Sequence, residues 1–136
     1  MRMNEPKAKN SKQNQSQTLL YVVDDEPMLL ELATVILEPL GYQIKTFRDP
    51  EAALQAYSSS SPQPDVLITD YAMHAMNGLA LLRACRRIRP QQKVLLVSGT
   101  VDESIYRHTT DKPDRFLAKP YQAKQLVDQV HALLKD

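Results

Sequence analysis

Five side chains that could bind phosphate or a metal ion each follow a short apolar run of the sequence. They are Asp24 and Asp25 after residues 19–23, Asp70 after 66–69, Ser98 after 94–97 and Lys119 after 116–118. The apolar runs have the length of buried strands. In an open parallel α/β sheet the carboxyl ends of the strands lie at one edge, and ligands bind in the crevice there. We therefore expect three carboxylates, one hydroxyl and one ammonium group to meet at one site.

Three neighbouring carboxylates require positive charge close to them. Two carboxylates about 4 Å apart repel each other by roughly 4 kcal/mol at an effective dielectric constant near 20. Lys119 supplies one positive charge, and a divalent metal ion would supply two more. Magnesium suits the site better than zinc, because the candidate ligands are all oxygens. Asp70 ends the run that has the composition of a central strand, so it is the candidate nucleophile.

The elements that must position these side chains alternate between strands and helices. This alternation predicts right-handed crossovers and a parallel sheet. The segment from Val101 to Asp114 has few apolar residues and contains Pro113, so its helix should be short or irregular. The predicted strands cover 19–23, 42–47, 66–69, 93–97 and 116–118, and the other helices begin near Pro27, Asp49, Gly78 and Gln122, with ends near Pro39, Ser58, Ile88 and Leu134.

Four short motifs carry a family resemblance. They are Val22-Val23-Asp24-Asp25-Glu26, then Asp70-Tyr71-Ala72-Met73 followed by Met76-Asn77-Gly78, then Ser98-Gly99, and finally Lys119-Pro120-Tyr121. In this order and at these separations the motifs resemble the receiver domain of bacterial two-component response regulators, over roughly residues 18–135. The resemblance implies an α/β, flavodoxin-like, doubly wound sheet of five parallel strands in the order 2-1-3-4-5, with about five helices. It also implies a receiver domain over residues 18–136.

The same resemblance implies a phosphoryl-transfer role for the five side chains. Asp70 would be the phosphoacceptor, whose carboxylate attacks the phosphorus of a phosphohistidine and forms an acyl phosphate. Lys119 and Ser98 would hold the phosphoryl oxygens together with the metal ion. The Mg²⁺ ligands would be Asp25 and Asp70 directly, Asp24 through water, and Ala72 through its backbone carbonyl.

Signalling in the family that the chain resembles depends on two switch residues. The hydroxyl of Ser98 would move toward the phosphoryl group, and the ring of Phe116 would rotate inward, which changes the face formed by the fourth helix, fifth strand and fifth helix. The chain would be a stand-alone, chemotaxis-type regulator that receives its phosphoryl group from a histidine kinase or a histidine phosphotransfer protein. It would catalyse only its own phosphorylation and dephosphorylation. The family usually has a cis peptide at the position of Lys119-Pro120.

Composition sets further limits on the class of protein. A chain of 136 residues has room for one domain and no separate DNA-binding or enzymatic output module. The single Cys85 and the absence of a signal-peptide-like start favour a cytoplasmic setting, and no apolar run reaches membrane-spanning length. The polar residues 1–17 are expected to be disordered. They hold four basic side chains and one Glu, which leaves 13 basic and 15 acidic residues in the rest, so direct nucleic-acid binding is not expected.

The same residues also allow other functions. Taken singly, Asp24 and Asp25 could be helix caps, Asp70 a turn residue, Ser98 a loop residue and Lys119 a solvated charge. A magnesium-dependent phosphatase of the haloacid dehalogenase type also uses an Asp after a strand, but it needs a second Asp two residues later, where this chain has Ala72. A phosphorylation-independent binding module is disfavoured because every residue that the phosphorylation chemistry needs is present.

Two further features are expected to have no catalytic role. His74 reads as a solvated loop residue, and the three histidines of the chain lack metal-ligand spacing. Arg83, Arg86 and Arg87 read as a solvated face of the helix that begins near Gly78, with docking as a minor alternative.

Overall fold

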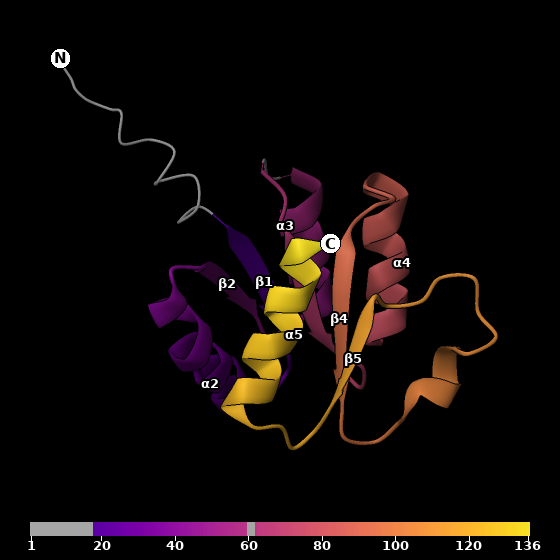
Figure 1. The fold of residues 1–136 in the computed structure, drawn as a ribbon. Helices are drawn as coiled ribbons and strands as arrows, with labels where there is room; N and C mark the ends of the chain where they lie inside the picture. The colour runs from indigo at the N-terminus through magenta and orange to yellow at the C-terminus, as the bar shows by residue number, and fades with distance from the viewer. Residues whose placement is uncertain (1–17, 60–61) are drawn as a thin grey trace, which may run out of the picture.

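The computed structural model describes residues 18–59 and 62–136 of the chain, so the predicted disordered tail, 1–17, lies outside the described residues. Within these ranges, strands alternate with four α-helices and two short 3₁₀ helices (Figure 1). The elements, in chain order, are β1 (Leu19–Val23), α2 (Pro27–Leu37), η1 (Glu38–Leu40), β2 (Gln43–Phe47), α3 (Pro50–Ser59), β3 (Val66–Asp70), α4 (Gly78–Ile88), β4 (Lys93–Ser98), η2 (Glu103–Tyr106), β5 (Arg115–Ala118) and α5 (Ala123–Lys135).

The strands form one sheet in the order β2-β1-β3-β4-β5, and every neighbouring pair is parallel. The predicted fold class and strand order are therefore confirmed, and the helix count is close to the predicted one. β2 lies at one edge of the sheet and is largely exposed, which suits its polar Gln43 and Lys45. Because all strands run in one direction, their carboxyl ends lie at the same edge of the sheet.

Helices cover both faces of the sheet (Figure 1). Along β1 successive side chains point to opposite faces, so Leu20 and Val22 pack into the core beneath α2 and α5. Leu19, Tyr21 and Val23 pack into the second core, beneath α3 and α4. β1 and β3 are buried along their whole length, which places the residues at their ends in a low-dielectric layer.

Local sequence signals set the helix ends that lie near the site. α4 begins at Gly78 because the side chain of Asn77 accepts a hydrogen bond from the backbone N–H of Ala80 at 2.9 Å. α2 begins with Pro27 at its first position, where a missing N–H leaves no bond unmade. The turn after α2 and η1 closes at Gly41, whose φ of 98° suits a residue without a Cβ. No helix in the described part of the chain is both long and apolar enough to cross a membrane.

The segment between β4 and β5 is irregular, as predicted. Its only helical element among the described residues is the 3₁₀ turn η2, which Asp102 caps by accepting a hydrogen bond from the N–H of Ser104 at 2.9 Å. Figure 1 shows the segment running away from the sheet and returning to β5. The family resemblance implied a helix between the fourth and fifth strands. Between β4 and β5 the described residues form no full α-helix.

The prediction that Arg86 belongs to a solvated face is wrong. Its guanidinium donates hydrogen bonds to the backbone carbonyls of Gln92 at 3.0 Å and Lys112 at 2.7 Å, and to the carboxylate of Asp114 at 2.9 Å. The side chain is only 16% exposed. Arg86 therefore fastens the end of the irregular segment to α4. Arg87, by contrast, is exposed as predicted.

Candidate functional site

The fold brings the predicted site residues to one edge of the sheet. Asp24 directly follows β1, Asp70 is the last residue of β3, Ser98 is the last residue of β4, and Lys119 directly follows β5. The register of the parallel strands fixes the relative positions of these residues along the strand direction, because Asp70 pairs with Val97 and Ser98 pairs with Ala118. The chemistry-bearing side chains therefore come from four strands that lie next to one another.

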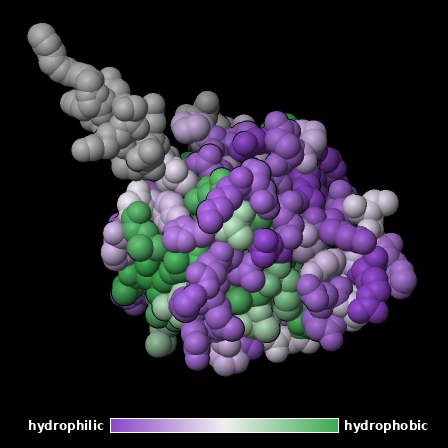
Figure 2. Space-filling model, viewed as in Figure 1, coloured by the Kyte–Doolittle hydropathy of each residue, from purple (hydrophilic) through white to green (hydrophobic). Residues whose placement is uncertain are grey.

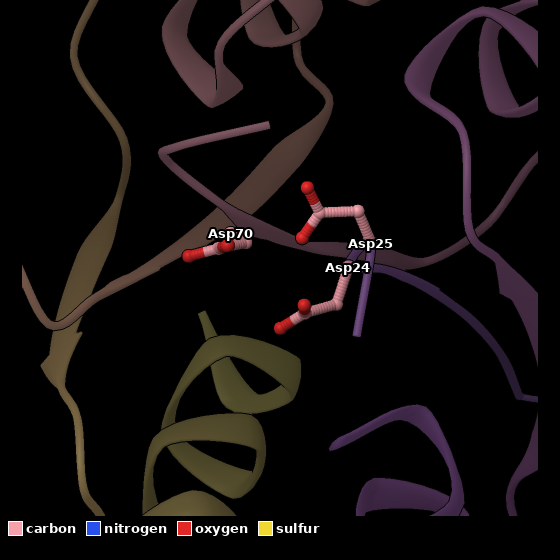
Figure 3. A group of neighbouring side chains, drawn as sticks. All are labelled: Asp24, Asp25 and Asp70. Carbon is pink, nitrogen blue, oxygen red and sulfur yellow. The ribbon is translucent and has the colours of Figure 1, made fainter. Parts of the chain in front are cut away.

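Three carboxylates form a cluster at this edge. Ligand atoms of Asp24, Asp25 and Asp70 lie within 4.8 Å of one another, and Figure 3 shows the three side chains approaching from two strand ends. Asp24 and Asp70 are nearly buried, at 5% and 8% exposure, whereas Asp25 is half-buried. Asp24 also accepts a hydrogen bond from the N–H of Glu26 at 2.9 Å, so it stabilises the start of α2 as well as contributing to the cluster.

Lys119 supplies positive charge to the two buried carboxylates. Its Nζ lies 2.9 Å from Oδ2 of Asp24 and 3.2 Å from Oδ1 of Asp70. The peptide bond between Lys119 and Pro120 is cis, as the family resemblance implied. One ammonium group supplies a single positive charge to a cluster of three carboxyl groups, so the cluster fits a divalent cation that prefers oxygen ligands.

The electrostatic environment perturbs both Asp70 and Lys119. Burial raises the pKa of the Asp70 carboxyl, and the charge of Asp24 adds to this rise, whereas Lys119 and the N–H of Tyr71 oppose it. Burial acts to lower the pKa of Lys119, but the hydrogen bonds and charges of Asp24 and Asp70 outweigh it and raise that pKa. Lys119 is therefore charged at neutral pH, and added positive charge at the cluster would favour ionised Asp70.

An open cavity of about 500 Å³ lies beside the cluster and is lined by Asp25 and Asp70. Ala72, two residues after Asp70, is exposed and lines this cavity with a side chain that has no polar atom. The role of its backbone carbonyl as a metal ligand stays a prediction. The residues that line the cavity are Asp25, Glu26, Asp70, Ala72, Gly99, Thr100 and Lys119.

The two predicted switch residues lie beside the site rather than in its cavity. Ser98 is only 1% exposed, and its Oγ accepts hydrogen bonds from the N–H groups of Thr100 and Val101, each at 3.1 Å. The ring of Phe116 is half-buried, and its centroid lies 6.4 Å from that of Tyr106 in η2. Both switch residues therefore contact the irregular segment between β4 and β5.

Sequence reasoning assigned no site role to three residues that line the cavity. Glu26 adjoins the acidic pair, and Gly99 and Thr100 directly follow Ser98, so their closeness in sequence was the available signal. His74 lies on the rim with its side chain 96% exposed, and its Nε2 is 3.9 Å from the Asp25 carboxylate. This exposure agrees with the interpretation of His74 as a solvated loop residue.

A parallel α/β sheet in this strand order, with an acidic pocket and a lysine at its carboxyl edge, is the arrangement of a receiver domain. The family model described as "Response regulator receiver domain" matches residues 20–131. The chain belongs to this family, whose members bind Mg²⁺ at an acidic pocket, and the cluster of Asp24, Asp25 and Asp70 provides such a pocket here.

Curated relatives support the assignment. The chain is 33% identical over 118 residues to the probable transcriptional regulatory protein TcrX of Mycobacterium tuberculosis, a match that covers 85% of this chain and 49% of TcrX. It is 28% identical over 130 residues to the alkaline phosphatase synthesis transcriptional regulatory protein SphR of Synechococcus elongatus, covering 85% of this chain and 48% of SphR. The chain spans about half the length of these relatives.

Solved structures show the same fold. A CheY-like receiver domain protein from Methanospirillum hungatei superimposes with a TM-score of 0.80 at 21% identity, over 88% of this chain and 94% of that one. TrrA from Thermotoga maritima, solved with Mg²⁺ and beryllofluoride, superimposes with a TM-score of 0.74 at 28% identity, over 86% of this chain and 99% of that one.

Proposed function

We propose that the chain accepts a phosphoryl group on Asp70 and signals by changing the surface that it offers to partners. The observation that carries the proposal is the convergence of Asp70 with two further carboxylates and Lys119 beside one open cavity. Asp70 is fixed at the end of a buried strand, so its carboxylate is held in one place for attack. The cavity leaves room for a phosphoryl group and its donor.

The chain's own residues take distinct parts in the reaction. A carboxylate oxygen of Asp70 attacks the phosphorus of a phosphohistidine, the bond from phosphorus to the imidazole nitrogen breaks, and that nitrogen recovers its electron pair. Lys119, which lies 3.2 Å from Asp70, is placed to bind a phosphoryl oxygen. Ser98 reaches the phosphoryl group only after leaving its present hydrogen bonds.

A magnesium ion would supply the positive charge that the cluster lacks and would neutralise the phosphoryl oxygens. Asp25 and Asp70 would hold it directly, Asp24 through a water molecule, and Ala72 through its backbone carbonyl. The donor set agrees with this ion, because all of these groups offer oxygen.

An apolar surface beside the site suits the donor, a histidine kinase or a histidine phosphotransfer protein. Met28 and Val35 on α2 are 80% and 65% exposed, and Figure 2 shows an apolar patch on the side of the molecule where α2 lies. An adjoining pocket is lined by Leu29, Leu32, Gly99, Lys119, Pro120 and Tyr121. Because Gly99 and Lys119 line both this pocket and the phosphoacceptor cavity, a donor that reaches Asp70 would also cover the apolar surface.

The direct test is the intact mass of the chain after incubation with Mg²⁺ and a small acyl phosphate donor. We expect one phosphate adduct in the wild type, and none in Asp70→Asn or after chelation of the metal. Asp128→Asn removes an exposed carboxylate from α5 and is the matched control, which should still be phosphorylated. An adduct that persists in Asp70→Asn would contradict the proposal, and a folded wild type that takes no phosphate even from histidine donors would favour a phosphorylation-independent module.

A further inference from the structure

The hydroxyl of Ser98 lies within hydrogen-bonding distance of three groups on the two residues that follow Gly99. A hydroxyl has two lone pairs and one proton. The N–H groups of Thr100 and Val101 occupy the lone pairs, each at 3.1 Å. Oγ1 of Thr100 lies 3.4 Å from the Ser98 Oγ. Since both lone pairs of the Ser98 oxygen already accept hydrogen bonds, the contact between the two hydroxyls is satisfied when Ser98 donates its proton to the Thr100 oxygen.

Thr100 also lines the phosphoacceptor cavity. It does so together with Asp70 and Lys119, whereas Ser98 is almost fully buried and is not among the lining residues. A phosphoryl oxygen on Asp70 can accept a hydrogen bond from Ser98 only by taking its single proton. The phosphoryl group and the Thr100 hydroxyl therefore compete for the same proton.

We propose that Thr100 is a positioning residue that holds the Ser98 hydroxyl in its resting arrangement and so opposes the phosphorylated state. The inference rests on the proposed function and adds to it a residue that regulates the same site. Thr100 acts only through Ser98. Removing its hydroxyl should therefore favour the phosphorylated arrangement as long as Ser98 is present.

The experiment measures the affinity of the chain for beryllofluoride, a phosphoryl mimic, in the presence of Mg²⁺ by NMR titration. Thr100→Val removes the hydroxyl and keeps the side-chain shape, and we expect beryllofluoride to bind about threefold to fivefold more tightly, the effect of one hydrogen bond. Thr100→Ser keeps a hydroxyl and should bind like the wild type. In a Ser98→Ala background, Thr100→Val should change nothing.

Two results would overturn the inference. One is an unchanged affinity in Thr100→Val, and the other is the same gain in the Ser98→Ala background, which would show that Thr100 acts without Ser98. Hydrogen exchange of the Val101 amide shows whether the local turn survives each substitution. A wild type that binds neither beryllofluoride nor phosphate would overturn the proposed function itself, so the two failures are distinguishable.

Discussion

Gly78, the first residue of α4, lies directly against the backbone of Asp70. A Cβ added at Gly78 would be 2.4 Å from the carbonyl oxygen of Asp70 and 2.8 Å from Cδ1 of Leu96. The N–H of Gly78 also donates a hydrogen bond to the carbonyl of Tyr71 at 2.8 Å. The start of α4 and the end of β3 are therefore packed backbone to backbone, which gives a physical reason for a glycine at this place in the motif.

Gly78→Ala should destabilise the fold by about 1–3 kcal/mol, because the Asp70 carbonyl cannot move away as a flexible side chain can. The loss should appear in urea unfolding followed by circular dichroism. Gly99→Ala is the comparison and should cost less, since its Cβ would lie 3.3 Å from Cβ of Lys119, a contact that a shift of a few tenths of an ångström relieves. Equal stability of wild type and Gly78→Ala would show that the backbone at the end of β3 shifts at little cost to make room for the Cβ.

Arg86→Lys should destabilise the chain by about 2 kcal/mol, because an ammonium group cannot reach all three acceptors that the planar guanidinium serves. Thermal unfolding gives the comparison. Arg87→Lys, on the exposed side of the same helical turn, should stay within about 0.5 kcal/mol of the wild type. If Arg86→Lys and Arg87→Lys have the same melting temperature, the hydrogen bonds of Arg86 to the segment before β5 do not stabilise the fold.

The edge of the sheet where the site lies could be predicted from the residues themselves, whereas the order of the strands was predicted only from the family resemblance. The apolar runs end in carboxylates, a hydroxyl and a lysine, which together could bind a metal ion and a phosphoryl group. The bounds of α4 follow from Asn77 before it and Pro90 after it. These signals are local in the chain. They need no knowledge of which distant residues touch.

The roles of Arg86 and Thr100 could not be predicted in the same way. Two acceptors of Arg86 lie 26 and 28 residues further along the chain, and one of them is a backbone carbonyl, which any residue carries. The contact of Thr100 with Ser98 depends on the direction of two hydroxyls in an irregular loop. The spacing of apolar residues along the chain does not predict either contact. Only the folded structure reveals them.

Charge placed on the apolar surface of α2 should interfere with the donor and leave the chemistry intact. Val35→Lys should slow phosphotransfer from the cognate histidine donor about tenfold, because the lysine would be buried without a partner in the complex. Phosphorylation by a small acyl phosphate should keep its rate. Ile88→Lys on α4 alters another exposed apolar residue and should affect neither reaction. If the rate of phosphotransfer from the histidine donor is unchanged in Val35→Lys, the donor must dock elsewhere.

Ala72 should make the phosphoryl group of this chain long-lived. It lines the cavity two residues after Asp70 and has no side-chain group to orient an attacking water molecule. Ala72→Asn should therefore speed hydrolysis about fivefold, the effect of one added hydrogen bond, as measured by the decay of the phosphorylated mass after removal of the donor. Ala75→Asn tests the same change in the same loop, at a residue outside the cavity lining whose φ of 75° asparagine tolerates. Hydrolysis that speeds little or slows in Ala72→Asn, or that speeds equally in both variants, would mean that the water is positioned by another group.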